Sequence, residues 1–405
     1  MNFITEKERN TPISDKCDLL VAGGGIAGIS AALAAAREGA KVTLIEREYM
    51  LGGLATLGLI AIYLPLCDGV GRQVSFGIAE ELLRLSIHFG VDRDEDVPAM
   101  KAWLTDENID VEARKKYRYA AQYNPHTFAA ECEQLLTKHG VKIIYGTVAV
   151  DANVDGGKIT HVMIENKSGR SAIEVKTVVD ATGDADIAQF SGAPTEKFGQ
   201  GNVLAAWYYS CGDKGYQLRM LGASDIPEEE KNGQERKPLI DRRFSGLDGD
   251  EISEQTFLSH RQTLADINAK RNAGENLVPV NIASTPQIRM TRRISGEYTL
   301  DSKEMHKYFE DSIGMVSDWR KRGPVYEVPF RTLYSGKIKN LICAGRCTSV
   351  TDAMWDIMRV IPCCAVTGQA AGTAAAMTDD FASLPVSELQ TQLKKDGVIL
   401  HEEDL

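Results

Sequence analysis

Apolar residues near the start of the chain form two short runs, separated by a glycine-rich turn and an alanine-rich segment. The run Asp18–Ala22 ends at Gly23 and is typical of a strand buried in a parallel sheet. The segment Ile29–Glu38 favours a helix, and Gly39 follows it in the position where glycine commonly ends helices. Lys41–Ile45 predicts a second strand. The pattern therefore predicts a strand–turn–helix–strand unit.

Two further blocks have regular patterns. Asn124-Pro125 is typical of a helix start, and that helix should end near His139. Turn signals separate three predicted strands near 142–150, 158–165 and 171–179. The last block has a predicted strand, Asn340–Ala344, and a helix after Pro362 whose small residues suit tight packing. The free N–H groups at the start of that helix favour a negatively charged group.

The first turn has the form of a nucleotide-binding motif. Gly23 through Gly28 fits G-x-G-x-x-G, and Glu46 stands at the end of the second predicted strand. Gly23 permits the tight turn, Gly25 lets the backbone approach a pyrophosphate, and Gly28 lets the helix lie close to the strand. Glu46 can accept hydrogen bonds from a ribose diol and would repel a 2′-phosphate. The motif predicts a bound dinucleotide, either NAD or FAD.

Composition narrows the setting. The chain has 405 residues, which suggests two or three domains, and its net charge of −11 argues against a nucleic-acid partner. A secretory signal is not evident, and glycines interrupt the apolar run Leu19–Ala36, so we expect no membrane span and a cytoplasmic protein. None of the eight cysteines has C-x-x-C spacing, so we expect reduced packing residues and no metal site.

Beyond these features, the sequence resembles the family of FAD-dependent oxidoreductases, within the glutathione-reductase-like flavoprotein superfamily. The matching segments extend from residue 18 to about residue 377 and read GGGIAGISAALAAAREGAKVTLIE, GGLATLG, VVDATGDADIAQFSGAP, RRISGEYTL and NLICAGRCTSVTDAMWDIMRVIPCCAVTGQAAGTAAAM. The resemblance implies an α/β fold: a Rossmann-type FAD-binding domain, with a parallel sheet and an antiparallel β-meander, and a substrate or cap domain built from insertions. It also implies an enzyme with FAD as cofactor.

The family's FAD contacts carry over to matching positions along the chain. The resemblance places the pyrophosphate at Gly23, Gly25, Ile26, Ala27 and Gly28, and the adenosine at Glu46, Arg47 and Val148. It places the rest of the cofactor path at Gly53, Ala181 and Gly183. It places the ribityl chain at Gly345 and Arg346, and the flavin pyrimidine edge at Ile361 and Cys363. Family members often have a histidine after the GRC segment, and here that stretch reads TSVTD. This stretch therefore supplies no histidine for chemistry that depends on one.

Catalytic side chains are less clearly marked. Arg359 precedes the flavin-facing helix and is a candidate to bind an anionic substrate or to stabilise reduced flavin, with a structural ion pair as the equal alternative. Arg292-Arg293 favours salt bridges over a carboxylate clamp. Trp355 and Tyr298 suit core packing as well as a pocket wall, and His126 suits a local structural role. A redox role for the Cys363–Cys364 pair is disfavoured, because disulfide reductases use a separate C-x4-C motif.

The domain organisation expected from these blocks is discontinuous. Residues 16–60, 124–195 and 336–378 should form the FAD-binding domain, residues 61–123 and 196–335 the substrate or cap region, and residues 379–405 a C-terminal tail. The cap region should contain a solvated loop over Ile226–Arg236 and an amphipathic helix near 252–273.

Three functions are compatible with the sequence. The favoured one is an FAD-dependent oxidoreductase that moves a hydride between a small organic substrate and flavin N5. The alternatives are an NAD-dependent dehydrogenase, which would not need the C-terminal GRC…GQAAG block, and a non-catalytic flavin-binding protein. The chain has one dinucleotide motif, so electrons should be exchanged with the substrate or with an external donor or acceptor. Assembly into a homo-oligomer stays open.

Overall fold

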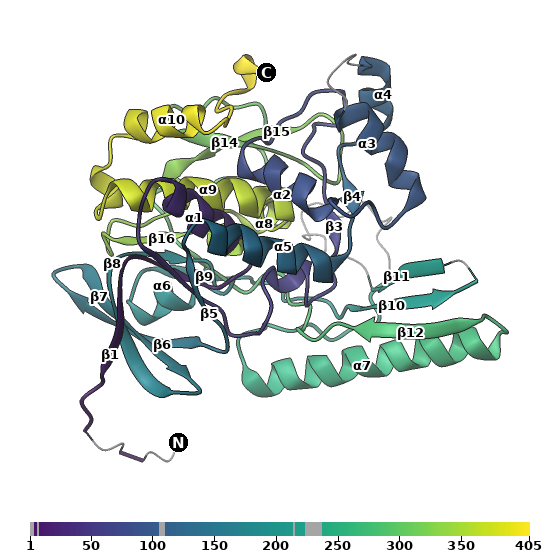
Figure 1. The fold of residues 1–405 in the computed structure, drawn as a ribbon, viewed down its shortest axis with the longest axis horizontal. Helices are drawn as coiled ribbons and strands as arrows, with labels where there is room; N and C mark the ends of the chain where they lie inside the picture. The colour runs from purple at the N-terminus through teal and green to yellow at the C-terminus, as the bar shows by residue number, and fades with distance from the viewer. Residues whose placement is uncertain (1–3, 6–7, 105–109, 214, 223–236) are drawn as a thin grey trace.

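A computed structural model describes residues 4–5, 8–104, 110–213, 215–222 and 237–405. The predicted loop Ile226–Arg236 lies outside these residues. The chain forms a large sheet with helices packed against it, and an elongated arm extends from one side (Figure 1). Among the described residues no single helix is long and apolar enough to cross a bilayer. Two helices that meet at 90°, Asp352–Met358 and Ile361–Met377, reach the required length and apolar composition only when they are counted as one segment.

The large sheet has seven strands, of which five are parallel. The parallel strands, in spatial order, are β5 (Lys142–Ile144), β2 (Val42–Ile45), β1 (Ile13–Ala22), β8 (Gly169–Asp180) and β16 (Leu341–Cys343). Strands β7 (Lys158–Asn166) and β6 (Val148–Asp155) continue from β8 as an antiparallel meander. The α/β fold class, with a parallel sheet and a meander, is therefore confirmed.

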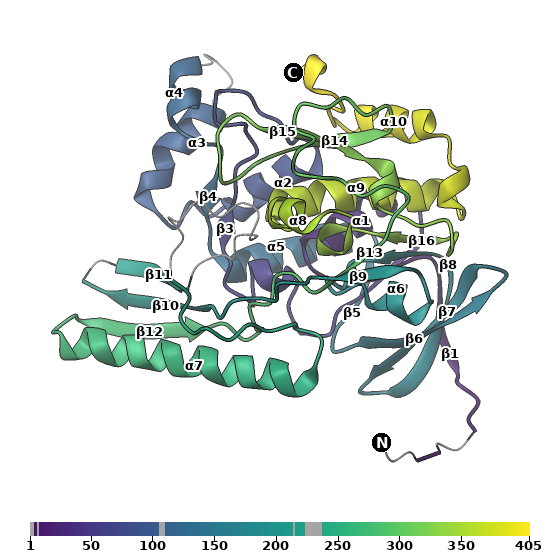
Figure 2. The ribbon, with the colours of Figure 1, turned by 180° about the vertical axis from the view of Figure 1, so that it is seen from behind.

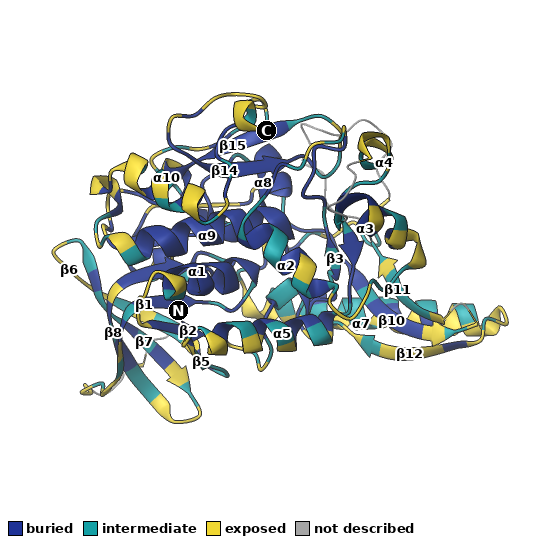
Figure 3. Cartoon of the chain, turned by 45° about the horizontal axis from the view of Figure 1, so that its top comes forward, coloured by how far each residue is buried: buried dark blue, intermediate teal, exposed yellow. Residues whose placement is uncertain are grey.

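Both faces of the sheet are buried, which explains the continuous apolar run in β1. Leu19 and Val21 point into the core cluster that contains the residues of α1 (Ile26–Arg37) and α9 (Ile361–Met377). Leu20 and Ala22 point the other way, into a second cluster beneath the meander and α6 (Asp186–Phe190). In Figure 3, α1 and α9 are accordingly almost entirely buried.

The sequence prediction of one strand over 142–150 was wrong. Residues Lys142–Ile144 pair in parallel with β2, whereas the chain from Val148 pairs with β7 in the meander. The turn between them passes through Gly146, whose φ of +58° suits glycine. The apolar pattern continues across this turn, so it could not reveal that the chain changes its neighbours.

The insertions form smaller units around this core (Figures 1 and 2). The arm consists of β10 (Ala206–Gly212), β11 (Gly215–Leu221), β12 (Leu277–Ile282) and α7 (Gly249–Asn272), which buries only one narrow face. The other helices are α2 (Ile78–Ser86), α3 (Val97–Leu104), α4 (Val111–Lys116), α5 (Pro125–Lys138), α8 (Asp352–Met358) and α10 (Val386–Lys395). Short strand pairs complete the fold: β3 (Ile62–Tyr63) with β4 (Ala121–Gln122), β9 (Thr195–Lys197) with β13 (Arg292–Ile294), and β14 (Ser312–Ser317) with β15 (Val325–Pro329).

Candidate functional site

A cleft of about 330 Å³ crosses the carboxyl ends of the parallel strands. Four of its lining residues, Ala22, Ile45, Ala181 and Ala344, stand at or just beyond the ends of β1, β2, β8 and β16. In open α/β sheets this edge is where ligands bind, because helix N-termini and loops meet there. The cleft is therefore the candidate site.

The glycine turn after β1 forms one wall of the cleft. Gly23 has φ +101°, and a Cβ there would lie 2.5 Å from the carbonyl oxygen of Ala181. A Cβ at Gly28 would overlap the carbonyl oxygen of Gly23, so this glycine allows α1 to pack closely. A Cβ at Gly25 would meet nothing within 4 Å, and Gly25 lines the cleft together with Ile26 and Ala27. The empty space beside Gly25 fits a pyrophosphate.

The N-terminus of α1 adds an electrostatic preference. Gly25 is its N-cap and supplies no side chain that could accept from the first-turn N–H groups. Gly53 lines the cleft nearby, because the Gly52 N–H donates to the Gly24 carbonyl at 2.8 Å and holds this segment beside the turn. Free N–H groups and the positive end of the helix favour a phosphate at this position.

Glu46 stands at the end of β2 and lines the same cleft. Its carboxylate accepts hydrogen bonds from the backbone N–H groups of Gly24, at 2.6 Å, and Glu48, at 2.8 Å. Burial raises the pKa of the Glu46 carboxyl, and these two N–H groups oppose that rise. Arg47 and Val148 line the cleft beside it. This is the end at which a ribose and an adenine would fit.

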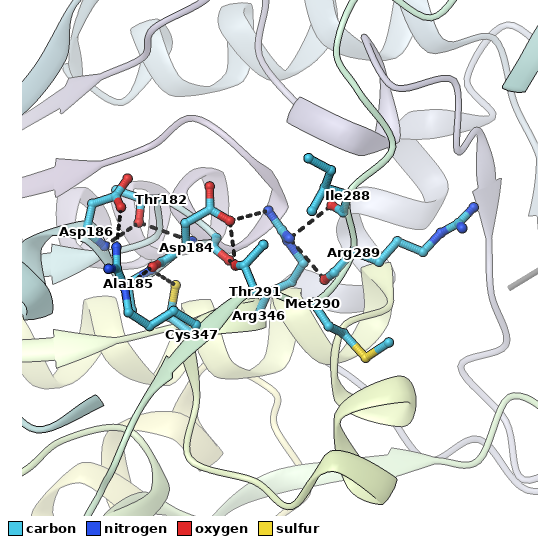
Figure 4. A network of polar contacts seen from close by, with 12 residues as sticks. Thr182, Asp184, Ala185, Asp186, Ile288, Arg289, Met290, Thr291, Arg346 and Cys347 are labelled. Carbon is cyan, nitrogen blue, oxygen red and sulfur yellow. Dashed lines mark hydrogen bonds and ion pairs between the residues drawn. The ribbon is translucent and has the colours of Figure 1, made fainter. Parts of the chain in front are cut away.

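The loop after β8 faces the cleft and is held by Arg346 (Figure 4). The Arg346 Nη1 donates to the carbonyl oxygens of Ile288 at 3.1 Å and Arg289 at 3.0 Å, and its Nη2 lies 3.7 Å from Asp184 Oδ1. A Cβ at Gly183 would overlap the guanidinium group. Arg346 thus joins the strand-end loop to a segment of the insertion.

Asp186, in the same loop region, has an unusual electrostatic setting. The pKa of the Asp186 carboxyl is raised to about 6, first by burial and then by the nearby Asp184 and Asp180, while Arg292 and Arg47 oppose the rise. Arg292 Nη2 donates to Asp186 Oδ1 at 2.7 Å. Both Asp184 and Asp186 line the cleft.

The other end of the cleft is formed by the start of α9. Val360, Ile361 and Cys364 line it, and Val360 is an N-cap without a side-chain acceptor, so first-turn N–H groups are available there. Cys363 is 1% exposed and is not among the cleft-lining residues. Burial raises the pKa of Cys364 to about 12, so this thiol stays protonated near neutral pH and is a poor nucleophile.

Arg359 lies at this end and is held in an ion pair. Its Nε donates to Asp356 Oδ1 at 3.0 Å and its Nη2 contacts the same oxygen, while the side chain remains only 8% exposed. Arg359 also lines the cleft. The structural ion pair, one of the two alternatives that the sequence left open, is present. The role of Arg359 in binding an anionic substrate or reduced flavin stays a prediction.

Other candidates lie outside the cleft lining. Gly345 is buried, with φ +67°, and a Cβ there would come within 2.7 Å of the Ala27 Cβ. Arg292 and Arg293 form ion pairs. Trp355 is fully buried and packs against Phe198. The Tyr298 hydroxyl forms a hydrogen bond with Glu304, and the His126 ring forms one with Asn281.

Sequence reasoning missed the part of the cleft contributed by the insertions. Ile62 and Leu64 of the first insertion line the cleft, as do Thr285 and Arg289 of the second, and Ile60 lines it just before the first insertion begins. None of these residues belongs to a motif, and they reach the cleft only through tertiary packing. The Thr285-Pro286 pair marks an extended backbone, but that signal does not indicate a site.

Comparisons with known proteins agree with this geometry. The family model described as "FAD dependent oxidoreductase" matches residues 18–205 and 205–393. A vinyl phenol reductase from Lactiplantibacillus plantarum is 28% identical over 188 residues, which cover 42% of this chain and 38% of that protein. The chain thus matches well under half of this curated relative's length.

The solved structures that match this chain are distant from it. A geranylgeranyl bacteriochlorophyll reductase-like protein from Thermoplasma acidophilum is 13% identical, with a TM-score of 0.47, and the match covers 94% of this chain and 83% of that one. A flavocytochrome c3 fumarate reductase in its open conformation is 15% identical, with a TM-score of 0.39, over 90% of this chain and 79% of that one.

Proposed function

The chain belongs to the family of FAD dependent oxidoreductases, and on that basis we propose that it moves a hydride between a small organic substrate and its FAD. The observation that carries this proposal is the continuity of the cleft, which is lined at one end by the glycine turn and Glu46 and at the other by Arg359 and the start of α9. FAD is an extended molecule, and it needs contacts at both ends of the cleft. When bound, FAD supplies the N5 atom that accepts or donates the hydride.

The residues of the chain hold the cofactor in this proposal. Gly25 and the first turn of α1 bind the pyrophosphate, and Glu46 accepts from the ribose hydroxyls. The first turn of α9 and Arg359 face the pyrimidine edge, where their positive potential stabilises negative charge. Asp356 fixes the direction of the Arg359 guanidinium through the buried ion pair.

The same proposal assigns parts of the chain to cofactor and substrate. Residues 16–60, 124–195 and 336–378 bind FAD, and the regions 61–123 and 196–335 cover the substrate. Support comes from Thr285, Ile288 and Arg289 of the second region, which line the cleft together with the FAD-binding residues. When FAD does not exchange electrons with the substrate, it exchanges them with a donor or an acceptor outside the chain. The eight cysteines are free thiols, which is consistent with a cytoplasmic enzyme.

The visible spectrum of the purified protein tests this function. We expect a flavin spectrum, free FAD in the supernatant after heat or acid precipitation, and anaerobic bleaching when a substrate is added. A flavin that stays in the pellet would indicate a covalent link. A colourless protein that cannot be reconstituted with FAD would refute the proposal.

A further inference from the structure

Helix α7 buries one face and leaves the other exposed. Its buried face packs on the sheet of the arm, where Ile267 clusters with Tyr208 and Leu277, and the Tyr208 hydroxyl donates to Asp266 at 2.6 Å. The other face points away from the rest of the molecule, along the lower edge of Figure 1. The residues on this outer face therefore indicate which kind of surface fits against it.

Four exposed residues form a line along the outer face, which we call the α7 stripe. They are Asp250, Phe257, Leu264 and Arg271, and each follows the one before it by seven residues, or about two helical turns. Phe257 is 61% exposed and Leu264 is 60% exposed. Within the described residues, the side chains of Asp250 and Arg271 have neither a hydrogen bond nor an ion pair. The stripe thus presents two uncovered apolar side chains between two unpaired charges of opposite sign.

The α7 stripe is complementary to its own reverse. Asp250 is the second residue of α7 and Arg271 is the last but one, while Phe257 and Leu264 are equally far from the two ends of the helix. Two antiparallel α7 helices, related by a twofold axis through their midpoints, would therefore place Asp250 opposite the partner's Arg271. They would also place Phe257 opposite the partner's Leu264. A twofold interface uses the same patch on both subunits in this way.

Helix geometry allows this contact along the whole stripe. On a straight helix, a line of residues spaced by seven drifts by about 20° per heptad, and two helices that cross at about 20° keep such a line in contact. The helix dipole also favours an acid in the first turn and a base in the last turn, so the two charges alone have a simpler explanation. The dipole does not account for Phe257 and Leu264, whose apolar surface a second copy would remove from water.

We propose that two copies of this chain associate through the α7 stripe, with the two helices antiparallel about their midpoints. Helix α7 is about 36 Å long and offers a contact one helix wide. This is a small contact, because a standard interface buries about 800 Å² of each partner. Arg261, which is exposed, stands beside the midpoint, so the pair also brings two like charges near the axis. The dimer is therefore weak and forms as the protein concentration rises.

Sedimentation velocity of the FAD-loaded protein, over roughly 1–300 μM, measures this association. The sedimentation coefficient of the parent should rise from that of a monomer towards that of a dimer. Asp250→Arg brings two arginines together at each contact, and Arg271→Asp brings two aspartates together, so each change should raise the dissociation constant about tenfold or more. An equimolar mixture of the two variants should associate like the parent, because every mixed contact again joins an arginine to an aspartate.

Helix α10, at the top of Figure 1, supplies matched controls. Glu388 is exposed in its first turn and Lys395 is exposed in its last turn. Glu388→Arg and Lys395→Asp make the same changes of charge at the same helix ends and should leave the association unchanged. Circular dichroism and flavin content should show that all four variants fold and keep their FAD. The effects of Asp250→Arg and Arg271→Asp should fade at about 1 M salt, where charges are screened within about 3 Å.

Three results would overturn the inference. A parent that stays monomeric at the highest concentration would do so, as would variants of the α7 stripe that associate as tightly as the parent. A mixture of Asp250→Arg and Arg271→Asp that associates no better than either variant alone would show that these two residues do not meet across the axis. The proposed function would stand in all three cases, because it depends on FAD and substrate and not on assembly.

Discussion

At the scale of single residues, Gly25 separates cofactor binding from folding. A Cβ at this position meets nothing within 4 Å, and its backbone φ of −68° suits any residue. We therefore expect Gly25→Val to fold with the thermal stability of the parent apoprotein, while its side chain occupies the space that the pyrophosphate needs. The ratio of flavin to protein absorbance after purification with excess FAD should fall nearly to zero.

The matched control for this change is Gly249→Val. Gly249 also begins a helix and would also direct its Cβ into open space, and it does not itself line the cleft, although Gly246 and Ile252 do. This control should retain a full complement of FAD. A Gly25→Val protein that stayed fully loaded with FAD would contradict the assignment of the glycine turn.

A second residue-scale prediction concerns pH. The pKa of Asp186 is raised from 3.8 to about 6 by burial, and then by Asp184 and Asp180, against the opposing effect of Arg292 and Arg47. Because the folded state favours the protonated form, the contribution of this group to stability is complete below pH 4 and is lost as the pH rises towards 6. Asp186→Asn should therefore gain stability relative to the parent between pH 4.5 and 6.5.

Thermal unfolding of the two apoproteins across this pH range measures the difference. The melting temperature of Asp186→Asn minus that of the parent should increase with pH and level off above about 6.5. A difference that stays constant with pH would show that Asp186 titrates like an ordinary carboxyl.

At the scale of elements, the contact between α1 and α9 holds the two helix N-termini at the cleft. A Cβ at Gly372 would overlap the carbonyl oxygen of Ala31, and one at Gly368 would overlap that of Ala27. Gly372→Val should lower the free energy of unfolding by about 2–3 kcal/mol, which is typical of overpacking in a core. It should also weaken FAD binding, because α1 and α9 can no longer lie as close to each other as they do in the parent protein.

Ala376→Val is the control for this substitution, because Ala376 lies one turn further along α9 and is only partly buried. Valine is a better helix former than glycine, so a loss at Gly372 must come from packing and not from helix propensity. Chemical denaturation and FAD titration of both variants decide the question. Equal stability of the two variants would mean that the helices can separate without cost.

At the scale of the whole molecule, FAD should connect parts of the chain that are distant in sequence. The cleft is lined by residues near 46, 181–186, 285–289 and 344–364, all of which a bound cofactor can hold together. FAD at about 100 times its dissociation constant should stabilise the fold by roughly 2.7 kcal/mol through mass action alone. The melting temperature should therefore rise with FAD concentration.

Hydrogen exchange shows where this stabilisation acts. We expect backbone N–H groups in all four regions to exchange more slowly when FAD is present, and Gly25→Val to show no such change. Protection restricted to the glycine turn and Glu46 would mean that the start of α9 does not contact the cofactor.

Local features determined how much of this protein could be predicted from sequence. The glycine turn, the helix after it and Glu46 follow from neighbouring residues, because strand length, helix propensity and glycine conformation act over a few positions. The cap of α5 at Asn124 and the turns of the meander were recognisable for the same reason. These elements define the fold class and one half of the cleft.

Tertiary packing alone decided the rest, because it brings together residues that no local pattern connects. Cys364 lines the cleft while Cys363 points into the core, a choice made by how α9 rotates against α1. The strand predicted over 142–150 divides because its two halves find different partners. Thr285 becomes part of the cleft because hydrogen bonds to Leu57 and Gly58 hold its segment there, and the sequence carries no signal of contacts that span more than 200 residues.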